Sequence, residues 1–277
     1  MAHLQVFVML TQSFFLARFL RIKSRSIAGS VALFLCFHVV ISDVATAEAP
    51  RKSVETDSAE NAKKLTIITL GDSITKGVRR EVTAEQTFTS LLQNLLKEEG
   101  VTAQVINSGI GSERADQALK RLEKSAIDKK PDIVTIMYGT NDSYVDRGKT
   151  ESRLSLQQYR SNLQELVTRQ RKVNIVPVLM TEPRLGNTAR KNGLGEHPNL
   201  RLEQFVSVCR NVAEQMHVPL VDNYKYWTDH AKNNKSDIGV WTTDQCHPNP
   251  HGHKIITKTI LPVLLQTIRK DKPAKKP

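Results

Sequence analysis

Residues 65–75 read LTIITLGDSIT, a short apolar and β-branched run that ends in Gly-Asp-Ser. Such a run is typical of a strand that lies buried on both faces of a parallel sheet. Runs of the same kind recur along the chain, at 103–106, 133–137, 175–179 and 220–221. We therefore expect five strands, of which 65–70 is the first.

Longer amphipathic stretches separate these runs, with apolar residues three and four positions apart, as in helices that bury one face. The predicted helices are 88–98, 115–124, 156–171, 200–216 and 251–268. Strands that alternate with helices form parallel sheets covered on both faces. The sequence thus predicts an α/β fold, a three-layer α/β/α sandwich around a five-stranded parallel sheet.

The composition fits a soluble globular protein. The 277-residue chain is 39% hydrophobic and 25% charged, which leaves enough apolar material for a sizeable core, and we expect one catalytic domain at 64–268. The formal net charge is +12, but Lys and Arg are scattered and are not interleaved with aromatic residues. We therefore expect no nucleic-acid binding, whereas an anionic polymer or surface is compatible with the charge.

The first 47 residues have the organisation of a signal peptide. A basic segment at 18–25 precedes a mostly apolar segment at 27–41, and Ala45-Thr46-Ala47 supplies the small-x-small pattern that signal peptidase reads. We predict cleavage after Ala47 and a secreted or periplasmic mature protein. A retained anchor is the alternative, but the apolar segment is short for a spanning helix and contains His38, so no membrane span is expected after processing.

The remaining flanking segments are polar. Residues 48–63 predict a solvated linker, and 269–277 predict a disordered basic tail. Cleavage after Ala47 leaves two cysteines, Cys209 and Cys246, in an oxidising compartment. Two cysteines do not define a framework, so the sequence leaves a disulfide between them open. A monomer is the default expectation.

Four polar clusters stand at the predicted ends of strands or before the last helix, where parallel α/β sheets place their ligand crevice. They contain Asp72 and Ser73, then Gly109, then Asn141 and Asp142, and finally Asp244 with His247. Together they offer a hydroxyl, a glycine amide, a carboxamide, and a carboxylate with an imidazole. This set of groups is suited to acyl transfer.

Each cluster also has a plainer interpretation. Ser73 or its neighbour could serve only as a helix N-cap, Gly109 only as a turn residue, and His247 only as a surface residue beside Pro-Asn. A metal site formed by His247, His251 and His253 is a further alternative, but no cysteine or carboxylate completes a ligand set at regular spacing.

The four blocks resemble those of the SGNH hydrolases, also known as GDSL-type esterases and lipases. The Ser, Gly, Asn and His that name the family correspond to Ser73, Gly109, Asn141 and His247, and the resemblance extends from residue 65 to about residue 265. It implies a flavodoxin-like fold and a serine esterase that needs neither a metal nor an organic cofactor.

The resemblance also implies a catalytic role for three residues. Ser73 would be the nucleophile, and His247 would be the base that takes its proton. Asp244 stands three positions before His247, and in a tight loop this spacing lets its carboxylate accept the Nδ1 proton.

Four further assignments concern the oxyanion and the supporting loops. The N–H groups of Ser73 and Gly109 and the side-chain amide of Asn141 would stabilise the negative oxygen of the intermediate. Asp72 and Asp142 would hold their loops by accepting hydrogen bonds from backbone amides.

The substrate is less closely defined by the sequence. Secretion and the related SGNH enzymes suggest removal of acetyl or short acyl groups from carbohydrate, acting on a small-molecule or polysaccharide ester. A lysophospholipase or short-chain lipid esterase, and a non-catalytic carbohydrate-binding domain, are the alternatives. The loop 181–199 and an aromatic segment are expected to shape the pocket, the rings being Tyr224, Tyr226, Trp227 and Trp241.

Overall fold

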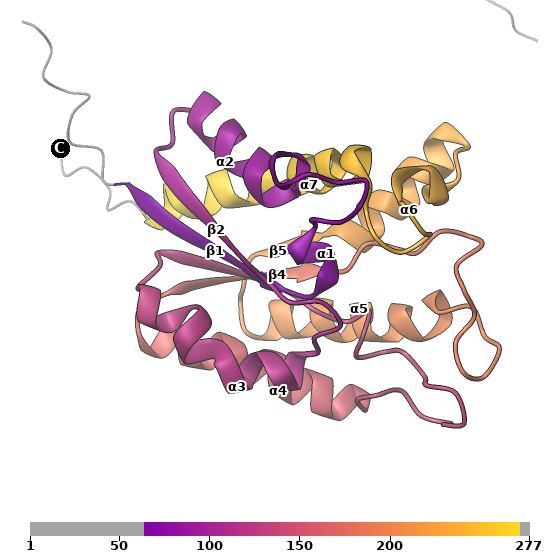
Figure 1. Cartoon of the computed structure of the whole chain (residues 1–277). Coiled ribbons are helices and arrows are strands. Elements are labelled where there is room, and N and C mark those ends of the chain that lie inside the picture. Colours follow the sequence, from indigo (N-terminus) through magenta and orange to yellow (C-terminus); the bar gives the residue numbers. More distant parts are fainter. Residues whose placement is uncertain (1–63, 272–277) are drawn as a thin grey trace, which may run out of the picture. The chain divides into compact units, whose positions relative to one another are not determined.

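The computed structural model describes residues 64–271, which form a parallel sheet between two layers of helices (Figure 1). The five strands lie in the order β2-β1-β3-β4-β5, and every pair is parallel. Their bounds are β1 Leu65–Gly71, β2 Ala103–Gly109, β3 Ile133–Met137, β4 Val176–Thr181 and β5 Leu220–Asp222. The predicted three-layer α/β/α fold with a five-stranded parallel sheet is confirmed.

The strand order reverses at β1. The chain passes from β1 to β2 on one side and then crosses to β3 on the other, so that Gly71 at the end of β1 lies opposite both Gly109 and Met137. The connections that leave β1 and β3 therefore run to opposite sides of the sheet. This is the position at which open parallel sheets form a ligand crevice.

The helices divide between the two faces of the sheet (Figure 1). One face is covered by α2 Phe88–Glu98, α6 Asn223–Asn234 and α7 Pro250–Asp271. The other is covered by α3 Ala115–Ser125, α4 Leu156–Lys172 and α5 Asn199–Gln215. Four short elements complete the description, namely α1 Ser73–Lys76, η1 Ala84–Gln86, η2 Ile127–Lys129 and η3 Ile238–Trp241.

Neighbouring residues of each strand enter different cores. In β1, Ile68 and Leu70 pack with the layer of α3, α4 and α5, whereas Ile67 packs with the layer of α2, α6 and α7. All three side chains are fully buried. Because side chains alternate across a strand, a sheet covered on both faces needs apolar residues at successive positions, which explains the unbroken apolar runs in the sequence.

Helix α6 is absent from the sequence-based prediction, and it changes the interpretation of the aromatic segment. Trp227 is completely buried in the core and contacts Trp241 edge-on, with ring centroids 5.4 Å apart. Trp227, on α6, and Trp241, at the end of η3, therefore pack together in the core and do not line the pocket. This helix contains few aliphatic residues, so its apolar periodicity is weak in the sequence. Tyr224, Trp227 and Ala231 nevertheless follow helical spacing.

The last helix extends past its predicted end. It continues to Asp271, so Arg269 and Lys270 occupy its final turn, where cations interact favourably with the unpaired carbonyls. The proposed signal peptide, the linker 48–63 and residues 272–277 lie outside the described residues. Within 64–271, no helix is long and apolar enough to cross a membrane. Cys209 and Cys246 are both free thiols.

Candidate active site

Ser73 occupies the first position of α1, two residues after the end of β1. The Oδ1 atom of Asp72 accepts a hydrogen bond from the Ile74 N–H at 2.8 Å and so caps this short helix. Both Asp72 and Ile74 are buried, whereas Ser73 keeps partial access to solvent. The strand end and the cap therefore present the serine hydroxyl at the carboxyl edge of the sheet.

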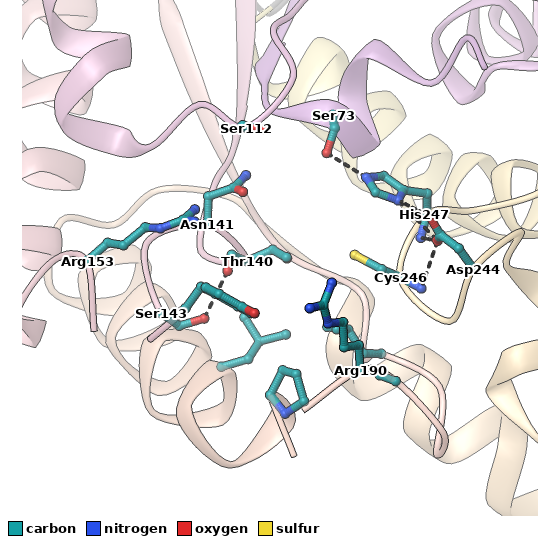
Figure 2. Close-up of a pocket in the computed structure, with 15 residues that line it drawn as sticks. Ser73, Ser112, Thr140, Asn141, Ser143, Arg153, Arg190, Asp244, Cys246 and His247 are labelled. Carbon is teal, nitrogen blue, oxygen red and sulfur yellow. Dashed lines mark hydrogen bonds and ion pairs between the residues drawn. The ribbon is translucent and has the colours of Figure 1, made fainter. Parts of the chain in front are cut away.

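The hydroxyl of Ser73 meets a histidine from the far end of the chain. Ser73 Oγ lies 2.9 Å from Nε2 of His247, a residue 174 positions later, and the other ring nitrogen lies 2.8 Å from Oδ2 of Asp244 (Figure 2). The structure thus brings together the three residues that the sequence proposed as nucleophile, base and orienting carboxylate. This geometry allows proton transfer from a hydroxyl to an imidazole.

The loop that carries His247 is closed by its own carboxylate. Oδ1 of Asp244 accepts hydrogen bonds from the N–H groups of His247 at 2.8 Å and Cys246 at 3.2 Å. Partial burial opposes ionisation of Asp244, but the hydrogen bonds from His247 and the charge of Arg79 hold its pKa below the usual range. Asp244 therefore stays ionised at neutral pH, and its carboxylate can accept a proton-sharing hydrogen bond from Nδ1 of the imidazole.

Arg79 is a site residue that the sequence analysis missed. Its guanidinium donates to Thr243 Oγ1 at 3.0 Å and to Asp244 Oδ2 at 3.2 Å. The pairing joins the segment after α1 to the loop of Asp244, although the residues are 165 positions apart. Nothing in the sequence around Arg79 indicates this partner.

Asn141 lies beside Ser73, at the wall of the same pocket (Figure 2). Its Nδ2 atom donates to Oδ2 of Asp72 at 2.7 Å and to the carbonyl of Glu113 at 3.2 Å. Asn141 is therefore oriented by one short hydrogen bond to a buried carboxyl group and one longer bond to a neighbouring loop.

The structure does not bring Gly109 into the pocket. Its N–H donates to Oδ1 of Asn107 at 2.9 Å, and a Cβ atom added at this position would overlap the backbone of Lys76 in α1. The glycine is thus required for close contact between β2 and α1. The backbone of α1 therefore lies in close contact with Gly109.

Ser112, three residues further on, lines the pocket instead. Its φ of 60° lies in the left-handed region, which turns the peptide in a direction that few residues other than glycine adopt. Among residues 64–271, the N–H of Ser112 has no hydrogen-bond acceptor, and neither has the N–H of Ser73. Sequence patterns do not report φ, so this residue was missed.

A buried ion pair holds the loop that carries Ser112. The guanidinium of Arg121 pairs with Glu113 and also donates to the Ser108 carbonyl at 2.7 Å. Tyr138, directly after β3, donates its hydroxyl to the same carboxylate at 2.7 Å. These contacts fix both ends of the loop 109–113 between α3 and β3, so the orientation of the Ser112 peptide is defined by side chains outside the pocket.

Three carboxyl groups lie completely buried behind the pocket. Burial raises the pKa of Asp72 to about 7, although hydrogen bonds from Ile74 and Asn141 lower it. Burial also raises the pKa of Asp142 to about 7, and that of Glu182 well above its usual value, where the charge of Asp72 adds to the effect. As predicted, Asp72 and Asp142 accept backbone hydrogen bonds, the latter from Ala115 N–H at 2.9 Å.

The pocket has a volume of about 290 Å³ and mixed polar and apolar walls. The expected contribution of the loop 181–199 is present in Leu185, Ala189, Arg190 and Pro198. Cys246 also lines the pocket, beside His247. The cavity is small, at the lower end of the roughly 300–1,000 Å³ typical of ligand sites.

The histidines do not converge on a metal site. His253 is buried in α7 and accepts a hydrogen bond from the Phe88 N–H at 3.2 Å, while burial lowers its pKa to about 4. His251 is exposed. No group of three potential metal ligands occurs within the described part of the chain.

Comparison with known proteins places this site in a family. The model of the GDSL-like lipase/acylhydrolase family matches residues 69–255. The acetylxylan esterase of Geobacillus stearothermophilus is 27% identical over 210 residues, which cover 70% of this chain and 91% of that protein. The uncharacterized lipoprotein YqeF of Bacillus subtilis is 27% identical over 216 residues, which cover 70% of this chain and 87% of that protein.

Solved structures agree with the sequence comparisons. The lipase/acylhydrolase of Enterococcus faecalis matches with a TM-score of 0.61 and 25% identity, covering 76% of this chain and all of that one. The chain therefore belongs to the GDSL-like lipase/acylhydrolase family, whose members with a Ser-Gly-Asn-His set are the SGNH hydrolases. It is a carboxylic ester hydrolase.

The contact between Gly109 and α1 generates a first prediction. We expect Gly109→Ala to lower the free energy of unfolding by about 1–3 kcal/mol, because the new methyl group must displace the backbone of Lys76. Gly111→Ala is the matched control, since a Cβ there meets no atom within 4 Å, and its effect should stay within about 0.5 kcal/mol. Chemical denaturation measures both, and equal stabilities would contradict the packing role of Gly109.

Asp142 generates a second prediction. A raised pKa means that the folded protein binds the proton more tightly than the unfolded chain, so this group lowers stability as pH rises from about 4 to above about 7. Asp142→Asn keeps an acceptor for the Ala115 N–H and removes the ionisation. We expect about 1–3 kcal/mol of added stability at pH 8 and little change at pH 4.

Denaturation curves at the two pH values test this expectation. Asp146→Asn, on the same loop, is the control with the opposite sign, because the hydrogen bond from Arg153 lowers the pKa of Asp146 and its loss should destabilise the protein at pH 8. An equal loss of stability at both pH values in Asp142→Asn would show that folding does not raise the pKa of this carboxyl group.

Proposed function

We propose that this chain hydrolyses oxygen esters through an acyl-serine formed on Ser73, and that its natural substrates are acetyl or short acyl groups on carbohydrate. The proposal is carried by two consecutive hydrogen bonds, which form a Ser-His-Asp row. Ser73 Oγ lies 2.9 Å from Nε2 of His247, and Nδ1 of the same ring lies 2.8 Å from Oδ2 of Asp244. Such a row activates a hydroxyl that is otherwise a weak nucleophile.

In the proposed reaction, Nε2 of His247 takes the proton from Ser73 as its oxygen attacks the ester carbonyl. The imidazolium is stabilised by Asp244 and then gives its proton to the departing alcohol, leaving an acyl-serine. A water molecule then loses a proton to the same imidazole and attacks the acyl group. Return of that proton to Ser73 releases the acid and restores the starting state.

The negative oxygen of each intermediate needs donors that are free in the resting site. The N–H groups of Ser73 and Ser112 meet this requirement within the described chain, and the amide of Asn141 lies at the same wall. We therefore propose Ser112, in place of Gly109, as the loop donor. Asn141 would exchange its longer bond to the Glu113 carbonyl, at 3.2 Å, for a bond to the oxyanion.

The size of the pocket and the relatives support a short acyl group. A cavity of only about 290 Å³ favours an acetyl group and a sugar ring over a long fatty chain. One relative is named an acetylxylan esterase and another a lipoprotein, which agrees with an enzyme acting on a polysaccharide outside the cytoplasm. The predicted signal peptide, with cleavage after Ala47, is part of the same proposal.

Substitution of the nucleophile tests the reaction. Ser73→Ala should abolish hydrolysis of 4-nitrophenyl acetate while the thermal unfolding temperature stays within a few degrees of the wild-type value, because the side chain is small and only partly buried. Wild-type activity on acetylated xylan against lysophospholipid then distinguishes a carbohydrate esterase from a lipid esterase. Retained turnover in Ser73→Ala would remove this residue from the mechanism.

The oxyanion donors are tested by a pair of variants. Asn141→Ala should lower kcat about 10² to 10³-fold with a smaller change in KM, since the bond forms in the transition state. Ser112→Gly retains the peptide N–H and accepts the φ of 60°, so its activity should remain within a few-fold of wild type. If Ser112→Gly were as inactive as Asn141→Ala, the side chain and not the peptide of Ser112 would be required.

A further inference from the structure

Arg190 lies on the long connection between β4 and α5 and points into the pocket, opposite Ser73 (Figure 2). The residue is exposed, yet its loop is fixed on two sides. The N–H of Gly186 donates to the Gln245 carbonyl at 2.8 Å, and the N–H of Gly193 donates to the Val145 carbonyl at 2.7 Å. Arg190 thus lies between two backbone hydrogen bonds that fix its loop. The acceptor of the first bond, Gln245, is two residues before His247.

The other charges around the pocket are paired. Arg153, the second arginine of the wall, makes two hydrogen bonds to Asp146 at 2.9 and 2.7 Å and lies over the ring of Tyr144. Asp244 is the one carboxylate among the lining residues, and it is paired with His247 and Arg79. Within residues 64–271, Arg190 has no ion-pair or hydrogen-bond partner, so the pocket carries one uncompensated positive charge.

The buried carboxyl groups behind the pocket do not fully neutralise the positive charge of Arg190. Asp72, Asp142 and Glu182 are buried away from solvent, and burial raises the pKa of all three carboxyl groups, which favours their neutral forms. Arg190 therefore remains the cation to which an anionic group entering the pocket would respond.

We propose that Arg190 binds a carboxylate on the ester substrate, so that the enzyme prefers acylated acidic sugars or hydroxy acids to their neutral counterparts. This proposal rests on the proposed esterase function. A guanidinium offers a planar pair of N–H donors that matches a carboxylate, and the loop anchors hold it at a fixed place relative to His247. The positive charge of the chain is in keeping with an anionic substrate.

Matched substrates test the preference. We would measure kcat/KM for two pairs of anionic and neutral esters. In the first pair, 4-acetoxybenzoate against 4-acetoxybenzamide, the anionic ester has its carboxylate on the alcohol. In the second pair, mono-4-nitrophenyl glutarate against 4-nitrophenyl butyrate, it has its carboxylate on the acyl group. Wild type is compared with Arg190→Gln, with Arg190→Lys, and with Lys191→Gln, which removes the same charge from the exposed neighbouring residue. Comparing each variant with wild type cancels the intrinsic reactivity of the esters.

In at least one of the two pairs, Arg190→Gln should lower kcat/KM for the anionic ester about tenfold and leave the neutral ester nearly unchanged. Arg190→Lys should recover part of the loss, Lys191→Gln should show none, and added salt should weaken the preference in every form that keeps a cation at position 190. Equal effects on anionic and neutral esters in both pairs, or equal losses in Lys191→Gln, would overturn the proposal. Failure of wild type to hydrolyse any ester would instead contradict the proposed function.

Discussion

One buried carboxyl group, that of Asp72, joins the parts of the site that come from different strands. One oxygen caps α1 and so positions Ser73, and the other receives the amide of Asn141 from the connection after β3. Glu182, directly after β4, is buried close to Asp72, and burial together with the Asp72 charge raises the pKa of Glu182. Taking this carboxyl group out of water is unfavourable, and the two hydrogen bonds offset that penalty only when α1 and the β3 loop hold their native positions.

The site has two structural origins. Ser73 and Asn141 lie on short connections within four residues of the ends of β1 and β3, so the paired strands limit their separation. Asp244 and His247 belong to a loop that is closed by its own hydrogen bonds and is tied to η3, where the Asn249 N–H donates to the Trp241 carbonyl at 2.9 Å. The long loop after β4 adds the substrate-facing wall. The proposed chemistry thus depends on the sheet and the closed loop, whereas the proposed substrate preference depends on Arg190.

The sequence predicts most of the fold because the strands of a covered parallel sheet are strongly apolar and the long helices are strongly periodic. The predicted bounds of α2 and β3 match those of the structure to the residue. Helix α6 is missing from the prediction because it has aromatic and polar residues where other helices have the aliphatic residues that form an apolar face. The residues of the Ser-His-Asp row could be predicted because local spacing and family resemblance both indicate them.

Other parts of the site depend on information that a linear pattern lacks. The residue type of Gly109 suggests a backbone donor near substrate, but a linear pattern does not report its close contact with Lys76 of α1. Ser112 depends on a backbone dihedral angle, and Arg79 depends on a partner 165 positions away. Glu182 resembles a solvent-exposed acid in the sequence, and only the tertiary fold buries it.

The distance along the chain between Ser73 and His247 has a consequence for biosynthesis. On the proposed mechanism, a nascent polypeptide exposes its nucleophile after about a quarter of its length has been synthesised, yet it has no general base until the segment before α7 has emerged and folded onto α1. Hydrolysis therefore begins only with the completed tertiary structure. The order of synthesis thus keeps the nascent chain inactive until the segment that carries His247 has folded.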